Sequence, residues 1–279
     1  MGMKENGIFE IPRDIAQNRK LIVSLSKNDF KKKFAGSYFG IVWAFVQPIV
    51  TVVLYWFVFE KALNPGTLST KDGINVPYIL WLLAGLVPWF FFSEVINAGT
   101  NVLLEYNYLV QKVVFKISTL PVVKIISSLF VHVFFVVFTI VLLTCYGFTP
   151  SLYLLQIIYY SFAMIMLSLG IIYFTSAVVV FFRDLSQLIN IVLQVGMWVT
   201  PIMWNFNGME GRVPHILMEI LKLNPFYYIV TGYRETLFDH VGFWNHPLLT
   251  LYFWLVVLLF LFIGGRVFTK LQDHFADVL

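Results

Sequence analysis

Charged residues are scarce in this chain: Asp, Glu, Lys and Arg together make up only 12% of its 279 residues. Soluble domains carry about 25%. Because 59% of the residues are hydrophobic, the composition indicates an integral membrane protein. Cysteine is nearly missing as well, since Cys145 is the single one. One cysteine excludes a disulfide framework and a cysteine-based metal cluster within one chain.

Long apolar runs fill most of the remaining sequence. A helix needs roughly 20 mostly apolar residues to cross a hydrocarbon core of about 30 Å. Six segments reach or approach that length: residues 39–60, 76–97, 120–146, 152–182, 185–204 and 248–268. Arg183 and Asp184 alone separate the fourth from the fifth, so these two helices must pack antiparallel. The fourth run is long, and we expect it to tilt, to protrude or to break near Gly170.

Basic residues predict the orientation. Most of the 19 Lys and Arg residues fall on the side of the two termini, which predicts that both termini are cytoplasmic. Six spans allow this arrangement. The first 37 residues are polar and basic without an apolar core, so we expect no cleavable signal peptide. We therefore divide the chain into a cytoplasmic amphipathic segment (1–37) and a transmembrane domain (38–279).

Two cytoplasmic segments carry apolar stripes. Within residues 11–33 the isoleucines and Leu25 recur at helical spacing, which predicts an amphipathic helix in the plane of the headgroups. This helix is either a membrane anchor alone or a docking surface as well. The segment 105–117 places valines beside Lys112 and Lys116. Either the membrane or a partner protein covers that second stripe.

Few polar side chains interrupt the spans. Glu94 and His132 stand out, because ionisable groups in a membrane need a cavity or a partner. For His132 we expect a neutral ring satisfied by a neighbouring helix. Glu94 is either a functional acid or a hydrogen-bond partner between helices. Pro48 and Pro88 lie inside apolar runs and predict kinks.

The stretch 205–247 is too charged to cross a bilayer and too apolar for a free loop. Two helical patterns, 213–223 and 226–238, flank Asn224 and Pro225, a pair suited to the N-cap and the first position of a helix. Each pattern is too short to cross. We therefore predict two outside helices that re-enter the membrane and line a cavity, since such backbone survives only under protein or water.

Several motifs appear together in one order. They are GSYFGIVWAFVQP (36–48), LYWFVF (54–59), PYILWLLAGLVPWFFFSEVINAGTNVL (77–103), YLVQKVVFKISTLP (108–121), FFRDLSQLINIVLQVGMWVTPIMW (181–204) and NPFYYIVTGYRETLF (224–238). On these motifs the chain resembles the membrane subunits of ABC-2 type exporters, and more narrowly the permeases that export lipid-linked polysaccharides and wall teichoic acids. LYWFVF, LLAGLVPWFFF and SLYLLQIIYY resemble the teichoic acid branch, while FFRD is shared with the O-antigen branch. Lys116 departs from the proline expected there.

The resemblance implies a transport function. We expect a permease that pairs with a second copy of itself and with two cytoplasmic ATPase subunits, moving an undecaprenyl-diphosphate-linked polymer, most specifically wall teichoic acid, out of a bacterial plasma membrane. The alternatives are an O-antigen or capsule-type export permease, or an ABC-2 exporter of drugs or small lipids. The chain has no G-x-x-x-x-G-K-[ST] loop and no Gly-Lys pair, so ATP and Mg would bind the partner. We expect no catalytic site, cofactor, metal or nucleic acid in this chain.

The same resemblance assigns candidate site residues. The substrate path would use Trp43, Phe45, Gln47, Tyr55, Trp89, Gln194, Trp198 and Trp204, although each aromatic ring has the ordinary alternative of facing lipid or packing helices. Cations for the pyrophosphate would be Lys31, Lys32, Lys33 and Arg183, or these serve topology alone. ATPase coupling would involve Glu105, Tyr108, Lys112, Lys116, Arg183 and Asp184, with Asp184 alternatively a helix cap. The outside gate would contain Asn224, Pro225, Tyr227, Tyr228, Tyr233 and Arg234. A secondary transporter or a membrane glycosyl- or phosphotransferase fits less well, because no internal repeat and no catalytic cluster is visible.

Overall fold

The structure, a computed structural model, describes residues 10–62, 68–69, 75–110, 116–205 and 214–279. Almost every described element is helical. The longer helices are α3 (Trp43–Tyr55), α4 (Tyr78–Thr100), α7 (Leu120–Cys145), α8 (Gln156–Val179), α9 (Leu185–Val199) and α12 (Pro247–Leu271). The shorter ones are α1 (Glu10–Gln17), α2 (Arg19–Lys32), α5 (Val102–Glu105), α6 (Asn107–Val110), α10 (His215–Lys222), α11 (Pro225–Arg234) and α13 (Phe275–Val278). Two short antiparallel strands, β1 (Leu68–Ser69) and β2 (Asn75–Val76), complete the set.

Within the described residues, five continuous helical segments are long and apolar enough to cross a membrane. They are Gly40–Phe59, Tyr78–Thr100, Ile117–Cys145, Leu152–Val179 and Pro247–Val278. Four of them extend a named helix with a short 3₁₀ or π turn: η1 (Gly40–Val42) and η2 (Trp56–Ala62) around α3, η3 (Ile117–Thr119) before α7, η4 (Leu152–Leu155) before α8, and η8 (Gln272–His274) after α12. The prediction of an all-α, multi-pass membrane protein is thereby confirmed.

Helix α9 is shorter than the run 185–204 predicted. It ends at Val199 because Thr200 precedes Pro201, and the ring of a proline disfavours helical backbone in the residue before it. Thr200 accordingly has an extended backbone, with φ −74° and ψ 136°. The residues after it leave the helix axis, and Ile202 is fully buried.

Helix α8 does not break near Gly170, contrary to one of the three expected outcomes. It continues through this glycine, which packs against α12. A Cβ atom on Gly264 of α12 would lie 2.2 Å from the carbonyl oxygen of Gly170. The two glycines therefore permit the backbones of α8 and α12 to approach more closely than larger residues would.

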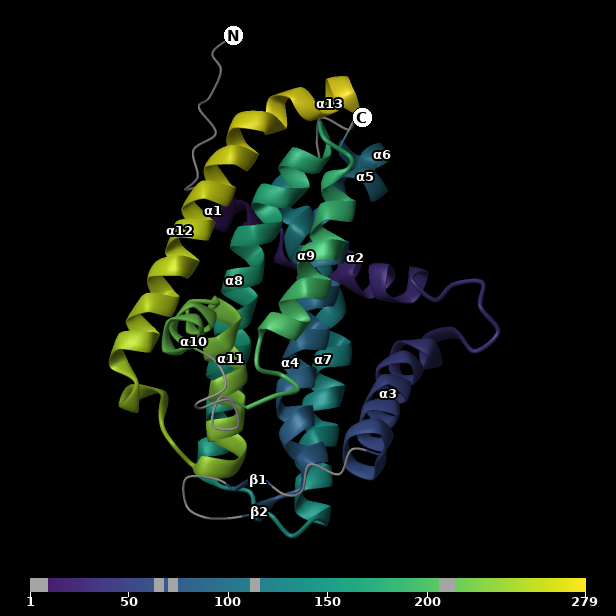
Figure 1. Ribbon diagram of the computed structural model, residues 1–279. Coiled ribbons are helices and arrows are strands. Elements are labelled where there is room, and N and C mark those ends of the chain that lie inside the picture. The colour runs from purple at the N-terminus through teal and green to yellow at the C-terminus, as the bar shows by residue number, and fades with distance from the viewer. Residues whose placement is uncertain (1–9, 63–67, 70–74, 111–115, 206–213) are drawn as a thin grey trace.

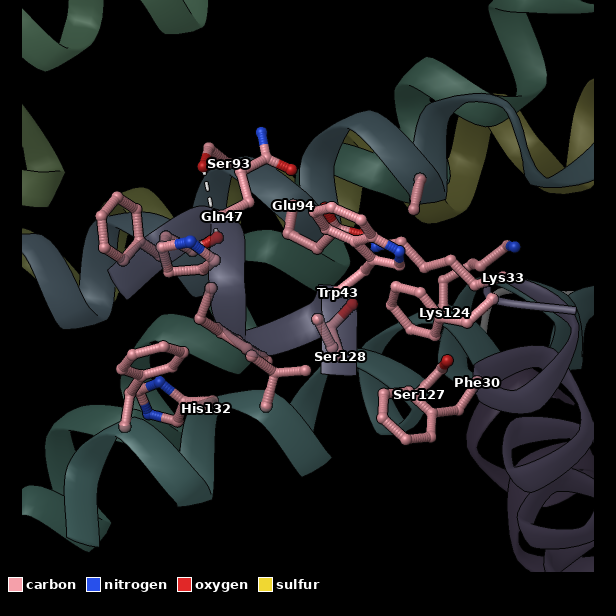
Figure 2. Close-up of a pocket in the computed structure, with 18 of the residues that line it drawn as sticks. Phe30, Lys33, Trp43, Gln47, Ser93, Glu94, Lys124, Ser127, Ser128 and His132 are labelled. Carbon is pink, nitrogen blue, oxygen red and sulfur yellow. Dashed lines mark hydrogen bonds and ion pairs between the residues drawn. The ribbon is translucent and has the colours of Figure 1, made fainter. Parts of the chain in front are cut away.

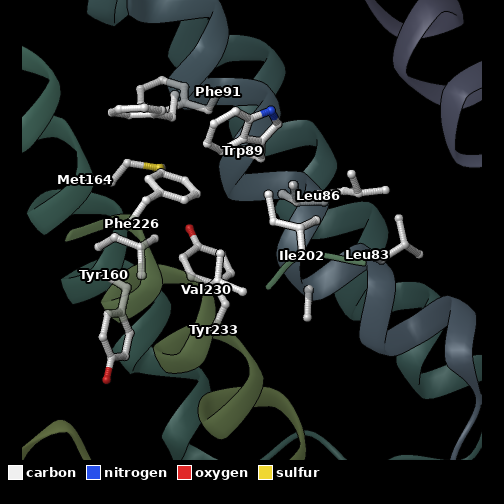
Figure 3. Close-up of a cluster of buried hydrophobic side chains, with 14 of the residues drawn as sticks. Leu83, Leu86, Trp89, Phe91, Tyr160, Met164, Ile202, Phe226, Val230 and Tyr233 are labelled. Carbon is white, nitrogen blue, oxygen red and sulfur yellow. The ribbon is translucent and has the colours of Figure 1, made fainter. Parts of the chain in front are cut away.

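The helices form a bundle from which one member stands apart. In Figure 1, α4, α7, α8 and α12 run roughly parallel to one long axis, α2 crosses that axis, and α3 lies to one side. Figure 3 shows the core, where side chains of α4, α8 and α11 meet around Trp89, Phe226 and Tyr233. The exposure of α3 agrees with this arrangement, because only 11% of the apolar segment Gly40–Phe59 that contains it is buried.

The N-terminal segment forms two helices where the sequence suggested one over residues 11–33. Helix α1 ends at Gln17, and α2 begins at Arg19 after a turn at Asn18. Ile11 of α1 joins a buried cluster with Tyr106, Phe268 and Phe275. The N-terminal helix and the C-terminal end of α12 thus meet at the same end of the bundle, opposite β1 and β2 (Figure 1).

Candidate functional site

A buried cluster of charges ties α2 to the bundle. Asp29 lies on α2 and is 6% exposed, and Lys124 lies on the first turns of α7 and is 5% exposed. The Lys124 ammonium donates to Asp29 Oδ1 at 2.7 Å and to Glu105 Oε2 at 2.7 Å. The Tyr106 hydroxyl donates to the same Asp29 oxygen at 2.6 Å. Three elements that are distant in sequence, α2, the α5–α6 turn and α7, therefore share one polar centre.

The partners of Asp29 decide its protonation. Desolvation by burial would raise the pKa of its carboxyl, but hydrogen bonds from Lys124 and Tyr106 and the charge of Lys124 outweigh it and lower the pKa. Burial and the neighbouring Asp29 carboxylate raise the pKa of the Tyr106 phenol. The cluster therefore carries an ionised aspartate and a neutral phenol at neutral pH.

A second polar contact fixes α1. Ser118 donates to Asp14 of α1 at 3.0 Å, and Lys116 lies 3.4 Å from the other carboxylate oxygen of Asp14. Tyr173 of α8 donates to the Ser118 carbonyl at 2.7 Å. The short turn η3 therefore links α1 to α8. Both N-terminal helices are attached to the ends of membrane-spanning helices.

Sequence reasoning missed Asp29 and Lys124 as a pair. Asp29 looked like one of many polar residues on the outer face of an amphipathic helix. The available signal was Lys124, because it lies inside the apolar run that starts at Leu120 and an ammonium ion there needs a partner. Its partner, Asp29, lies 95 positions away, and no local sequence pattern predicts a pairing over that separation.

The predicted coupling residues lie at the same end of the bundle but have different surroundings. Glu105 belongs to the charge cluster and Lys116 to the contact with Asp14. Tyr108 is 46% exposed, and Arg183 and Asp184 are exposed as well. Asp184 occupies the N-cap position of α9, yet its side chain makes no capping hydrogen bond. Lys112 lies outside the described residues.

An open cavity of about 440 Å³ lies between α2, α3, α4 and α7. Figure 2 shows Trp43 and Gln47 of α3 on one side of it and Ser127, Ser128 and His132 of α7 on another. Lys33 and Glu94 form an ion pair along its wall. Glu94 therefore pairs with Lys33 at the end of α2. The sequence predicted that Glu94 could have a partner on another helix but did not identify this residue.

His132 meets the expectation of a ring satisfied by a neighbouring helix at one of its two nitrogens. Its Nε2 atom lies 3.2 Å from the hydroxyls of Ser161 on α8 and Tyr233 on α11. Those two hydroxyls are 2.7 Å apart. The ring therefore joins three helices, and Nδ1 has no hydrogen-bond partner among the described residues.

The proposed path residues divide into buried and exposed groups. Trp89 is 5% exposed and packs edge-on against Phe226, so its indole belongs to the core of this chain. Phe45 and Tyr55 are half-buried against other rings. The exposed members are Trp43, Gln47, Gln194 and Trp198. The Trp204 indole donates to the carbonyl of Trp198 at 2.8 Å.

The outside segment begins as its sequence predicted. Asn224 is the N-cap of α11, its side chain accepts from the Phe226 amide, and Pro225 is the first helical residue. The Asn224 amide also donates to Thr200 at 2.7 Å, directly after α9. α11 is therefore attached to the end of α9. The arrangement of 213–223 agrees in its described part, where α10 covers His215–Lys222.

Arg234 is buried in a cage of carbonyl groups. Its guanidinium donates to the carbonyls of Pro201 at 2.5 Å, Ile202 at 2.7 Å and Trp81 at 3.4 Å, and it stacks on the Trp81 ring. Two of the other gate residues are buried: Tyr228 bonds to Tyr159 and Thr250, and Tyr233 bonds to Ser161. Asn224, Pro225 and Tyr227 are half-buried. α11 is thus fixed to α4, α8 and the end of α9.

Comparisons with known proteins agree with this architecture. A family model described as "ABC-2 type transporter" matches residues 20–238. The chain is 26% identical over 270 residues to the O-antigen export system permease protein RfbA of Myxococcus xanthus, covering 97% of this chain and 99% of that protein. It is 24% identical to a protein of the same description from Klebsiella pneumoniae, covering 93% and 95%. The matched region extends from α2 to Phe238, just beyond α11, and the protein belongs to the ABC-2 type transporter family.

Proposed function

We propose that this chain is the membrane half of an ATP-driven exporter of lipid-linked polysaccharide. Three features support the proposal: membership of the ABC-2 family, the length-wide similarity to proteins described as O-antigen export permeases, and a row of polar side chains on α9. The third is the observation that carries it.

Helix α9 presents amide side chains where a lipid-facing helix would present none. Gln187, Asn190 and Gln194 follow one another at spacings of three and four, so they lie on one face, and Trp198 continues it. All four are exposed, and the three amides make no side-chain hydrogen bond with the described residues. Amides in hydrocarbon without partners are costly. This face of α9 therefore meets water or another protein, and a hydroxyl-rich polymer can bond to such amides and stack on the indole.

The proposed topology has six crossings with both termini in the cytoplasm. Helix α9 is about 22 Å long, less than the roughly 30 Å of a hydrocarbon core, and residues 200–205 complete its passage. The meeting of α1 and α13 at one end supports an even number of crossings. α10 and α11 then lie outside as two re-entrant helices. Residues 1–37 form the cytoplasmic segment and 38–279 the transmembrane domain.

The proposed partners are a second copy of this chain and two ATPase subunits that bind ATP and Mg. The second copy would complete the path along α9 and α3. The ATPase would contact α1, α2 and the segment 105–117, since the charge cluster connects these elements to α7. Its motion would reach the spans through that cluster.

The proposal specifies the class of polymer, a lipid-linked polysaccharide, and two observations favour different members of that class. Motifs such as LYWFVF favour wall teichoic acid, whereas the relatives are described as O-antigen permeases. The uncharged row on α9 favours recognition through hydroxyl groups rather than through phosphate charge. The pyrophosphate of the carrier lipid would meet Lys31 and Arg183, which are exposed at the cytoplasmic end.

The experiment tests the α9 face directly. Gln194→Leu keeps the size of the side chain and removes its amide, and Val195→Leu is the matched control on the neighbouring exposed position. The measured quantity is the amount of polymer transported across the membrane of vesicles that contain equal amounts of permease and ATPase. We expect export to fall about tenfold in Gln194→Leu and to stay near wild type in Val195→Leu. Equal export by the two variants would refute the proposal.

Export of drugs or small lipids is the competing functional hypothesis. In that case the ATPase activity of the complex would rise with apolar drugs and stay unchanged with lipid-linked polysaccharide. The same vesicles measure both responses.

A further inference from the structure

The cavity between α3 and the α4–α7 pair differs from the α9 face and has a different chemistry. Its volume is about 440 Å³, within the range of about 300–1,000 Å³ that holds a small ligand. α3 forms one wall and is attached only loosely to the rest of the bundle. An open cavity of this size, lined by aromatic and charged side chains, is suited to a ligand with both an apolar and a charged part.

The charges along the cavity cancel. Its lining contains the acids Asp29, Glu94 and Glu105 and the cations Lys32, Lys33 and Lys124. Lys124 is occupied by Asp29 and Glu105. The accessible charges are therefore Lys32, Lys33, Glu94 and Glu105, of which Glu105 already contacts Lys124. The side chains of Lys33 and Glu94 are 48% and 41% exposed, so both can exchange their mutual contact for a ligand.

The interior of the cavity is apolar and aromatic. Away from the ion pair the lining consists mainly of Phe30, Trp43, Val87, Phe90, Phe91 and Phe135. Ser128 lies near the middle of the cavity, and Gln47, Ser93 and His132 lie on the side away from Lys33 (Figure 2). The site is thus amphipathic: the charged groups lie at the end near α2, and aromatic and aliphatic side chains with a few polar groups form the rest of the lining.

We propose that this cavity binds one phospholipid with a phosphoethanolamine headgroup. The phosphate contacts Lys32 and Lys33, the primary ammonium donates to Glu94, and one acyl chain lies between α3 and the α4–α7 pair. The proposal rests on the membrane location of the chain and is independent of the exported polymer. The bound lipid holds the loosely packed α3 against the bundle.

Charge complementarity selects this headgroup over the others. A phosphoethanolamine supplies an opposite charge to each member of the Lys33–Glu94 pair. An anionic phosphoglycerol would leave Glu94 beside a phosphate without a partner, and a diphosphate lipid would do so with more charge. A choline headgroup has no N–H and cannot donate to the carboxylate, which weakens the contact because hydrogen bonds to ions are the stronger ones.

Trp43 allows the proposal to be tested by fluorescence. The full-length chain is placed in phosphatidylcholine bilayers that contain a few mole per cent of dibrominated phosphatidylethanolamine, phosphatidylcholine or phosphatidylglycerol. Bromine quenches a nearby indole, and the difference between wild type and Trp43→Phe isolates the signal of Trp43. We expect phosphatidylethanolamine to quench Trp43 about fivefold more effectively per mole than phosphatidylcholine, equivalent to about 1 kcal/mol. Equal quenching by the three lipids would overturn the proposal.

A substitution reverses the expected order. In Glu94→Gln the ammonium loses its acceptor and Lys33 loses its carboxylate, so phosphatidylglycerol becomes the stronger quencher. The matched control is Glu219→Gln, because Glu219 is also half-exposed and paired with a lysine, Lys222, but lies on α10. This control leaves the order unchanged. An unchanged order in Glu94→Gln, or displacement of the brominated phosphatidylethanolamine by an equal amount of an isoprenoid diphosphate, would contradict the assignment.

Discussion

At the scale of single residues, Asp29 and Lys124 form a buried ion pair between α2 and the long apolar helix α7. Removing one partner of such a pair leaves the other charge buried. We expect Asp29→Ala to reduce the free energy of unfolding by about 3 kcal/mol, toward the lower end of such effects because Glu105 still contacts Lys124. Thermal unfolding of the purified chain in detergent measures this. Asp277→Ala, at an exposed carboxylate on α13, should change it by less than about 0.5 kcal/mol.

The same pair predicts a dependence on pH. The folded structure lowers the pKa of Asp29 below its ordinary value of 3.8. The stabilisation is therefore complete above that value and is lost as the pH falls through the lowered pKa. Wild type should keep its advantage over Asp29→Asn at neutral pH and lose it progressively as the pH falls below 3.8. Unfolding temperatures of the two proteins over this range test the sign. A gap that widens on acidification would show that the carboxylate is not the group that matters.

Arg234 holds three carbonyl groups with a planar side chain. A lysine has one ammonium on a flexible stem and cannot reach Trp81, Pro201 and Ile202 together. We expect Arg234→Lys to reduce stability by about 2 kcal/mol and to make the end of α9 more accessible to proteases. Arg266→Lys is the matched exchange at an exposed arginine and should have little effect. Equal protease sensitivity of the two variants would argue against a role of Arg234 in fixing α9.

At the scale of elements, the contact between α8 and α12 depends on two glycines. A Cβ atom at position 264 would lie 2.2 Å from a backbone oxygen that has no side-chain freedom to move away. Gly264→Ala must therefore separate the two helices, and we expect a loss of about 2–3 kcal/mol in the free energy of unfolding. Leu259→Ala, on the exposed face of α12, is the control. Wild-type stability of Gly264→Ala would mean that the helices can shift apart freely.

The comparison of sequence with structure is clearest for elements as well. Apolar length predicted where the long helices lie, and the Asn224–Pro225 pair predicted the start of α11. The end of α9 was readable from Pro201, because a proline restricts the residue before it, but the hydrophobicity of residues 200–204 concealed it. The partners of Glu94 and Asp29 were not readable. They depend on helices separated by 61 and 95 positions, and no local pattern encodes such a pairing.

At the scale of the whole molecule, a series of polar contacts connects one end of the bundle to the other. α1 and α2 are fixed by polar contacts to the ends of α7 and α8, α9 runs through the bundle with its amides exposed, and α11 is attached to the far end of α9. We infer that a force applied to α2 reaches α7 through Asp29 and Lys124. α9 and α11 would then move together, because Asn224 and Arg234 join them.

The central claim is that this chain conducts a polymer only when a separate ATPase acts on its cytoplasmic face. The most direct measurement is transport of lipid-linked polysaccharide into sealed vesicles containing the purified chain, with and without the ATPase and ATP. We predict transport with the ATPase and ATP together, and none when either is omitted. Transport by the chain alone, at a rate unaffected by ATP, would contradict the account.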